Sequence, residues 1–549
     1  MTSRTRKVSI TLLTVAGLVL GGAGTAGATT FCVPGFHAGC PANGSNVAQP
    51  DLETAMKTNG SDGVPDRVFV DAITYTNPAS IDPAGTDDLE VIGAGPAKTR
   101  LTSSSTGAGW VVDLNLAPRD VTMRDLRIVV PALGGNTSAV HSNGDTFQNV
   151  DIEAQEADAR GISPAEGGTT FRDGALLTTG AGTYTYGFWS DSGAAAEGEL
   201  LIERSVIANA LRSVSVDRAE TPLTMRRVAI LNPGETAVSA SASNDVAIDN
   251  SVIETGSSSP IYLYSTTPSA QDVALTNVTV DSSSGDSTVP AITGTVQATI
   301  GNGSIDIEID SSIIRGFDKA WQLQSPAGNA SIGDIFVAAE YSNLVPNGTN
   351  TGNGTTFLAP TNSQSDPRFS GFGDYRLRPD SPAIDAGNPS ATGLAPDFFG
   401  VARPVDGNED GTAIRDQGAY EYRPPVKPRP ACEVNPALCQ PPPPQDTTAP
   451  KVNRVLFRAP TRTRSGYLKF TLSEPATVRA TLKPTPAGKG RNKRKTLKLT
   501  ANGRAGVNRV KIKKGKMKLG RYRLTISATD AAGNRSGTLA GKVRVKPLR

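Results

Sequence analysis

The stretch LTMRRVAI, Leu223–Ile230, decides the fold because the same phrase returns along the chain. It recurs as VTMRDLRI from 121, DTFQNVDI from 145, TTFRDGAL from 169, LLIERSVI from 200, VAIDNSVI from 246, VALTNVTV from 273 and IEIDSSII from 307. The third residue of each copy is apolar: Met123, Phe147, Phe171, Ile202, Met225, Ile248, Leu275 and Ile309. Self-similarity at a nearly fixed spacing indicates a repeat architecture with insertions.

Within each copy the apolar spacing shifts once. The first and third positions alternate as in a half-buried strand, and the next core-type positions follow three and five residues later. A step of three interrupts a period of two, so a two-residue corner is expected inside each copy. Asn and Asp tolerate the left-handed backbone that such a corner needs. They fill its second position in five copies, as Asp125, Asn149, Asp173, Asn250 and Asn277.

Another short apolar strand follows each copy. These strands are AVH from 139, GIS from 161, GFW from 187, SVS from 213, AVS from 237, IYL from 261, AIT from 291 and AWQ from 320. Three short strands per turn predict an all-β chain built on a parallel β-helix, which we place at residues 61–345. A β-sandwich with evenly spaced strands is the alternative, but it does not account for the recurrent corner.

Residues from about 60 to 345 resemble the pectate-lyase-like right-handed β-helix superfamily, and RVFVDAITYTNP with DLEVIGAGPAKTRL resembles its opening turns. The resemblance implies a right-handed coil. The superfamily includes polysaccharide lyases, hydrolases, phage tailspikes and adhesins, so it implies no single activity. Residues 346–422 resemble a choice-of-anchor Q segment through Ser381–Gly387, Asp397–Gly400 with Arg403, and Asp416–Glu421. That likeness implies an extracellular protein with a closing module.

Residues 1–28 have the pattern of a secretory signal peptide. A basic start at Arg4, Arg6 and Lys7 precedes an apolar run and the small-residue site Ala26–Ala28. The run is too short and too often interrupted for a membrane span, and no other stretch is apolar enough. The mature protein is therefore expected to be secreted, either extracellular or associated with the cell surface.

Four cysteines agree with an oxidising compartment. Among the three possible pairings, the local bonds Cys32–Cys40 and Cys432–Cys439 are favoured, because each pair lies in its own loop. The spacing argues against zinc. Residues 29–60 are expected to cap the first turn, with a helix in DLETAMK from 51 whose Leu52, Ala55 and Met56 share one face.

The two ends of the chain differ sharply in charge. From Thr447 onward there are 28 Lys and Arg against two acids, a net charge of +26, whereas the rest carries −23. After a Pro-rich linker, residues 423–450, seven alternating runs predict a small basic Ig-like β-sandwich at 451–549. SEPATV and LGRYRLTISATDAAGNRS resemble Ig-like modules of exported bacterial proteins. The stiff linker is expected to keep this domain apart from the acidic remainder.

Partners follow from this charge and from the predicted location. An exported chain meets little nucleic acid, and the domain lacks the aromatic platforms of single-strand binders, so nucleic acid is not expected. An anionic cell-wall polymer or another polysaccharide is the expected partner, held by many weak contacts.

The resemblance implies that a substrate would lie along the superfamily's first strand sheet and its loops, which corresponds here to the short strand that follows each copy. Chemistry there needs carboxylates, often with calcium or with an Arg or Lys base. The outward column of that strand holds none of them: it is His141, Ser163, Trp189, Ser215, Ser239, Leu263, Thr293 and Gln322. Nearby Arg160, Glu166, Asp191 and Asp217 form no repeated pair. A non-catalytic polysaccharide-binding or structural component is therefore expected, with a polysaccharide lyase or glycoside hydrolase as the alternative.

Candidate ligand contacts cluster near the longest insertion of the middle turns. They are Trp189, Tyr184, Tyr186, Asp191 and Asp217, of which the aromatic residues either stack on sugar rings or simply cover the solenoid.

One further stretch has the opening spacing of a calcium loop, with Asp406, Asn408 and Asp410 followed by Gly411. Gln417 stands where such a loop has its bidentate Glu, so a solvated acidic turn is an equal alternative. Ca²⁺ is the only cofactor that the sequence suggests.

Overall fold

The computed structural model describes most of the chain between residues 28 and 545. The described ranges are 28–58, 63–77, 87–115, 120–134, 137–164, 168–180, 182, 185–190, 198–216, 221–241, 245–256, 258–265, 270–283, 287–297, 303–326, 333–393, 395–425, 447–461, 463–485 and 494–545. The predicted signal peptide, most of the linker and the Cys432–Cys439 pair lie outside them, as do Tyr184, Glu166, Asp191 and Asp217.

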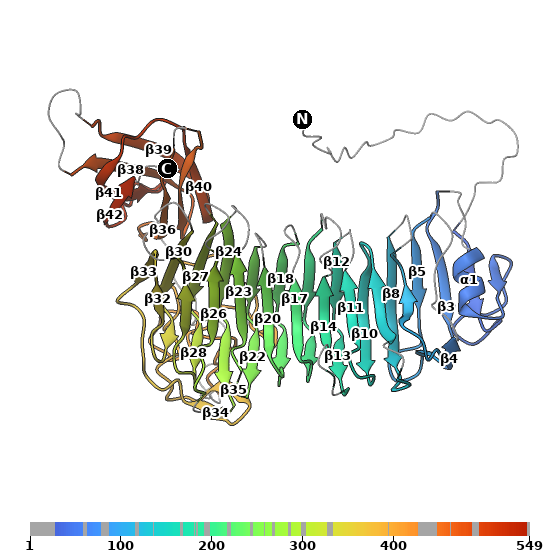
Figure 1. The fold of residues 1–549 in the computed structure, drawn as a ribbon. Helices are drawn as coiled ribbons and strands as arrows, with labels where there is room; N and C mark the ends of the chain where they lie inside the picture. The colour runs from blue at the N-terminus through green and yellow to red at the C-terminus, as the bar shows by residue number, and fades with distance from the viewer. Residues whose placement is uncertain are drawn as a thin grey trace, which may run out of the picture.

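Stacked parallel strands form an elongated solenoid, as a parallel β-helix requires (Figure 1). The larger of its two sheets, the long sheet, has 23 strands. They are β1 (Thr30–Val33), β2 (Asn46–Ala48), β3 (Asp66–Val70), β4 (Thr74–Asn77), β5 (Leu89–Ile92), β6 (Arg100–Ser103), β8 (Val121–Val130), β10 (Thr146–Ala154), β12 (Thr169–Arg172), β13 (Ala175–Thr178), β15 (Leu200–Glu203), β16 (Val206–Ala208), β18 (Leu223–Arg226), β19 (Ala229–Leu231), β21 (Val246–Asp249), β22 (Val252–Thr255), β24 (Ala270–Thr276), β25 (Thr279–Ser282), β27 (Ser304–Asp310), β28 (Ile313–Arg315), β30 (Asp334–Glu340), β31 (Asn343–Leu344) and β33 (Gly354–Leu358).

The second, ten-stranded sheet consists of the third strand of each turn. Its members are β7 (Gly109–Asp113), β9 (Thr137–Ser142), β11 (Arg160–Pro164), β14 (Tyr186–Ser190), β17 (Arg212–Val216), β20 (Thr236–Ser241), β23 (Ile261–Ser265), β26 (Ile292–Val296), β29 (Trp321–Gln324) and β32 (Thr349–Thr351). Both sheets continue beyond the predicted boundary at residue 345, since β32 pairs with β29 and β33 pairs with β30.

The predicted interior column is present. Met225 pairs with Ile248, Ile248 pairs with Leu275, and all three side chains are fully buried. Each turn therefore buries its apolar face against its two neighbours, which is how a thin solenoid acquires a continuous core.

The predicted corners adopt the left-handed backbone, with φ between 48° and 58° at the five Asn and Asp positions. Copies with other residues adopt it as well: Arg204, Arg227 and Ser311 have φ of 46°, 57° and 50°. The corner is thus imposed by stacking, and Asn or Asp only lowers its cost.

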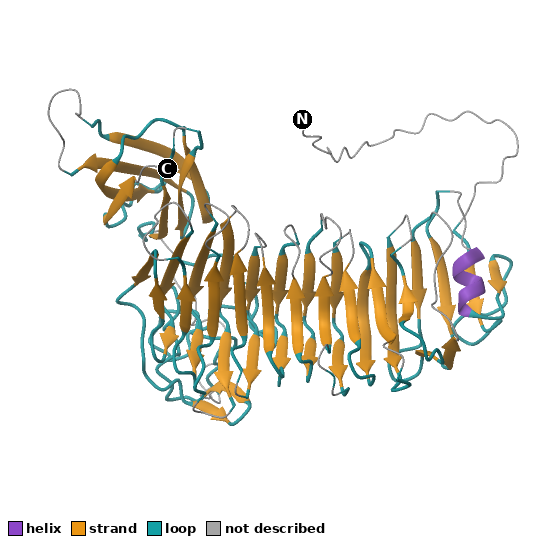
Figure 2. Ribbon diagram, in the orientation of Figure 1, coloured by secondary structure: helices purple, strands orange, loops and turns teal. Residues whose placement is uncertain are grey.

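The N-terminal end is closed as the sequence predicts. The single α-helix of the described residues, α1 (Leu52–Thr58), buries Leu52, Ala55 and Met56 against the first turn (Figure 2). Asp51 caps it by accepting a 2.7 Å hydrogen bond from the Thr54 amide. The predicted Cys32–Cys40 disulfide is present.

Residues 359–425 run along the side of the last turns and contain one antiparallel pair, β34 (Phe369–Gly371) and β35 (Asp374–Leu377). Leu377 and Ala383 pack on Ile313, and Tyr375 packs on Val252. The motifs that resemble a choice-of-anchor Q segment contribute residues to a buried polar network. In this network the Arg403 Nη1 lies 2.7 Å from the Glu421 Oε2. The segment is a brace along the solenoid.

The C-terminal domain has two antiparallel sheets that share one apolar core. One sheet has the order β36 (Val452–Arg458), β37 (Gly466–Leu472), β40 (Gly506–Ile512). The other has the order β39 (Leu497–Gly503), β38 (Ala476–Pro484), β41 (Gly520–Thr529), β42 (Leu539–Val545). The domain contacts the solenoid beside β24, β27 and β30, contrary to the expected separation (Figure 1). The C-terminal domain is strongly basic and the rest of the chain is acidic. These opposite net charges attract the two parts to each other.

Candidate functional site

The outer face of the ten-stranded sheet carries the predicted outward column. Strand register places His141 beside Ser163, Trp189 beside Ser215, and Ser215 beside Ser239. One assignment was wrong: Leu263 is buried, and Tyr262 takes its place beside Ser239 with 38% exposure. In IYL the flanking Ile261 and Leu263 both enter the core, so the aromatic residue between them must face outward.

Register also extends the column by one turn, to Asp113 on β7, which pairs with His141. The His141 Nδ1 lies 3.2 Å from the Asp113 Oδ1, and the His141 ring stacks on Trp110 with centroids 4.6 Å apart. Burial alone would raise the pKa of Asp113, but the hydrogen bond to His141 and one to the Asn115 backbone leave it lowered. The carboxylate therefore stays ionised and orients the imidazole.

This Asp–His pair was missed because the sequence column was begun one turn too late, at His141. Ser163 lies next in the same column, but its hydroxyl donates a 2.9 Å hydrogen bond to the Trp189 carbonyl and its side chain is buried. The row Asp113, His141, Ser163 therefore offers no open nucleophile.

A second cluster lies on β11, β14 and β17. The Arg160 guanidinium is 3.4 Å from the centroid of the Trp189 ring, and Tyr186 lies 5.7 Å from the same ring. Arg212 donates to the Tyr186 hydroxyl and makes two 2.9 Å bonds to Glu235. Tyr186 itself is only 8% exposed, so it supports the cluster from beneath.

Three strands of this face carry aromatic residues that are not fully buried. Trp110, Trp189 and Tyr262 lie on β7, β14 and β23, three strands apart in each case. At about 4.8 Å per strand, β7, β14 and β23 are spaced roughly 14 Å apart. Register places Trp189 and Tyr262 in the column of His141, whereas Trp110 pairs with Ser138 and reaches that column by stacking on His141. Tyr264 stacks beside Tyr262 at 6.4 Å. His141 stacks on the Trp110 ring, and Arg160 lies over the Trp189 ring. The face therefore offers oriented hydrogen-bond donors backed by apolar surface.

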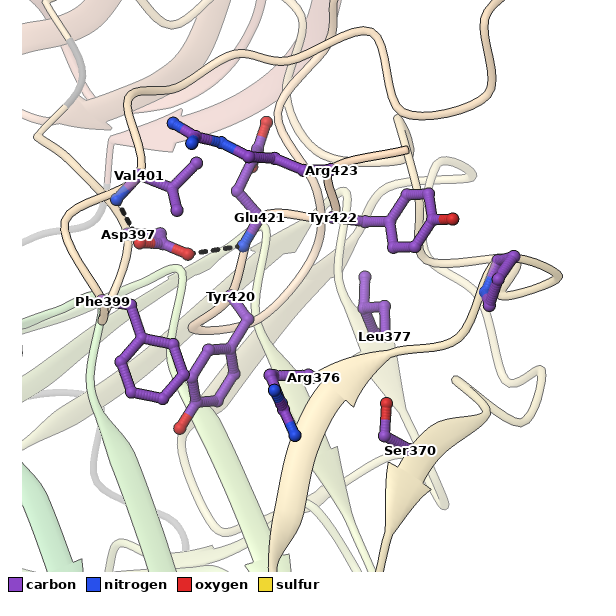
Figure 3. Close-up of a pocket in the computed structure, with 11 residues that line it drawn as sticks. Ser370, Arg376, Leu377, Asp397, Phe399, Val401, Tyr420, Glu421, Tyr422 and Arg423 are labelled. Atoms are coloured by element: carbon purple, nitrogen blue, oxygen red, sulfur yellow. Dashed lines mark hydrogen bonds between the residues drawn. The ribbon is translucent and has the colours of Figure 1, made fainter. Parts of the chain in front are cut away.

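A hollow of about 460 Å³ lies in the brace (Figure 3). The rings of Phe399 and Tyr420 form one side, with centroids 5.1 Å apart, and Arg376 lies beside Tyr420. Its buried carboxylate, Asp397, accepts hydrogen bonds from the Val401 and Glu421 amides at 2.6 and 2.9 Å. That carboxylate holds the loops together, which leaves an aromatic wall as the surface that a ligand could contact.

The predicted calcium residues fold their own loop. Asp406 accepts hydrogen bonds from the amides of Asp410 and Gly411, and Asn408 accepts one from Asp410. Asp410 accepts one from Thr412. Among the described residues no three His, Cys, Asp or Glu side chains gather as a metal site. Calcium binding at this loop stays a prediction.

No helix in the described ranges is long and apolar enough to cross a membrane.

Comparison with known proteins gives little. No protein-family model matches the chain, and no curated protein matches it. Among solved structures, chitinase ChiW from Paenibacillus sp. str. FPU-7, a cell-surface-expressed multi-modular enzyme, is similar at 12% identity and a TM-score of 0.15. The alignment covers 95% of this chain and 24% of the chitinase, so the chain spans about a quarter of that protein's length. A TM-score this low carries no argument about this chain.

Proposed function

We propose that this protein is a secreted bacterial surface or extracellular component that binds polysaccharide without cleaving it. The observation that carries the proposal is the set of aromatic side chains on the ten-stranded sheet, Trp110, Trp189 and Tyr262. The first two have a nitrogen-bearing side chain packed against the ring. Such groups can contact sugar rings and donate to hydroxyl or carboxylate oxygens at the same time. A solenoid face suits an extended polymer because it repeats its groups along one axis.

The remaining parts of the proposal follow from the sequence resemblances. The solenoid is pectate-lyase-like. Its coil is right-handed, because crossovers between parallel strands are generally right-handed. Residues 346–422 are a choice-of-anchor Q-type segment. The strand orders β36-β37-β40 and β39-β38-β41-β42 support an Ig-like C-terminal domain, since a seven-strand sandwich of this kind has three and four strands per sheet. This basic domain tethers the protein to an anionic wall polymer.

Binding to neutral and acidic polysaccharides, measured by calorimetry on the full chain, tests the proposal. Trp189→Ala and Arg160→Ala should each weaken binding about tenfold, the equivalent of about 1.4 kcal/mol. Phe372→Ala is the matched control, because Phe372 is 84% exposed but lies in the brace. Phe399→Ala reports on the hollow in the brace separately. Unchanged affinity in the two sheet variants would contradict the proposal.

The alternative is a lyase or glycosidase, and the Asp113–His141 pair is the observation that favours it. A histidine oriented by a carboxylate can move a proton at neutral pH. Incubation with the polysaccharide that binds should then release unsaturated or reducing ends, and His141→Ala should abolish the release. If no bound polymer releases unsaturated or reducing ends, with or without calcium, binding without cleavage is retained as the function.

A further inference from the structure

Seven acids gather on the outer face of the last turns of the long sheet. This acidic ridge consists of Asp245, Asp249, Asp272, Asp306, Glu308, Asp310 and Glu340. Strand register sets Asp272 directly beside Asp306, and Asp310 directly beside Glu340. Like charges on neighbouring strands repel, so this arrangement needs cations from elsewhere.

The C-terminal domain supplies them. Arg454 on β36 contacts the Asp310 carboxylate, which also receives Arg415 from the brace. Lys469 on β37 has its Nζ 3.7 Å from the Glu308 Oε2. The Arg454 side chain is 17% exposed and that of Asp310 is 3% exposed, so the first contact is shielded from salt.

Beside these ion pairs lies Tyr467, with Arg509 at 3.7 Å and Arg458 at 6.0 Å from its ring. Burial, and then the charges of Asp272 and Asp306 in the ridge, raise the pKa of Tyr467. The sheet β36-β37-β40 therefore presents a docking face: Arg454, Arg458, Tyr467, Lys469 and Arg509.

The ridge remains short of positive charge even with the domain in place. Burial and then the charge of Asp272 raise the pKa of Asp306 to about 7, although Arg458 opposes the shift. Asp334 and Glu308 add to the repulsion. Burial also raises the pKa of Glu340. Crowded, partly buried acids thus lie at the contact with the domain, and their repulsion and partial desolvation make the contact easier to reverse.

We propose that the docking face is a binding surface for a carboxylate-bearing polymer, and that the acidic ridge occupies it as an internal competitor. This inference rests on the tethering role proposed for the basic domain. Acids on adjacent strands follow one another at about 4.8 Å, so the ridge presents the domain with a short row of closely spaced carboxylates. A soluble polyanion of similar spacing meets the same cations without the repulsion and partial desolvation of the ridge acids. Polymer binding therefore releases the domain from the solenoid.

Glu308→Lys tests the competition in the full chain, because it places a cation against Lys469 and near Arg454. Glu199→Lys is the matched control: it makes the same change of charge at an exposed acid beside β15, far along the solenoid. The probe is polyglutamate, and its affinity is measured at low salt. Small-angle X-ray scattering without polymer reports whether the domain is released.

Glu308→Lys should bind polyglutamate at least several-fold more tightly than Glu199→Lys and should scatter as a longer particle. The charge swap Glu308→Lys with Lys469→Glu should restore the compact profile, which a misfolded solenoid would not do. Equal affinity and equal scattering in the two single variants would overturn the inference. If neither wild type nor variants bind any polyanion, the tethering function fails, while the scattering still decides whether the ridge holds the domain.

Discussion

Two stretches of the same sheet balance their charges in different ways. In the early turns, outward acids pair with an Arg of the next turn, as in the pair Glu90–Arg124 at 2.7 Å and the pair Asp173–Arg204 at 2.6 Å. In the late turns acids lie beside acids, and the cations that contact Glu308 and Asp310 come from more than a hundred residues later in the chain.

The difference shows where a solenoid stops being a nearest-neighbour structure. Early turns satisfy their charges locally, as expected for stacked repeats. Late turns depend on the brace and on the C-terminal domain, so their stability is coupled to sequence that lies outside the repeat. Substitutions of the same chemical type should therefore have small effects early and large effects late.

Asp310→Asn should have the largest effect. It leaves the buried Arg415 and the largely buried Arg454 without their carboxylate, and breaking a buried pair in this way costs about 3–5 kcal/mol. Asp173→Asn removes an equivalent charge from a half-exposed pair and should cost less than about 1 kcal/mol. Denaturant unfolding of both variants measures the difference. Equal costs would show that the late cluster is no more than a surface pair.

Asn277→Gly and Asn149→Gly compare two corners, because Gly keeps the left-handed backbone and removes only the side chain. Asn277 donates to the carbonyls of Asp416 and Gly418 in the brace and accepts from Arg415. Asn149 donates a hydrogen bond to Asp125 of the preceding turn and does not reach the brace. We expect about 2–3 kcal/mol for the late corner and about 1 kcal/mol or less for the early one, again from unfolding free energies.

The pH dependence of stability should differ in sign between the two stretches. Asp306 has a raised pKa, so the folded state holds its proton between about pH 4 and 7, and its contribution to stability falls as pH rises through that window. Asp173 has a pKa lowered by Arg204, so its contribution is present above its unfolded pKa and is lost as pH falls through the lower folded value.

Asp306→Asn should therefore flatten the loss of stability between about pH 4 and 7, by about 1–3 kcal/mol across that window. Asp173→Asn should change only the acid limb, below about pH 4. Unfolding free energies measured at a series of pH values separate the two. A wild-type slope that persists unchanged in Asp306→Asn would mean that other ridge acids carry the protons.

The sequence predicts the parts of this structure that depend on one turn and its neighbours. The interior column through Met225 and Ile248, the left-handed corners and the helical cap all follow from local spacing. The phase of a short apolar run does not, which is why Leu263 was placed outside in the position that Tyr262 takes.

Contacts between distant segments lie beyond such reasoning. The Asp113–His141 pair needs a strand register extended to the preceding turn. The meeting of Asp310 with Arg454 joins residues that no repeat relates. The opposite net charges of the solenoid and the C-terminal domain are compatible with attraction between them as well as with separation. The positions of the individual acids on β27 and β30 decide between the two arrangements.

Small-angle X-ray scattering from the full wild-type chain, at low salt and pH 8, tests the central claim most directly. If the late acids are neutralised by the C-terminal domain, one compact arrangement with β36 and β37 against β27 should account for the profile. A profile that requires the domain to lie away from the solenoid, at the end of an extended linker, would contradict the account.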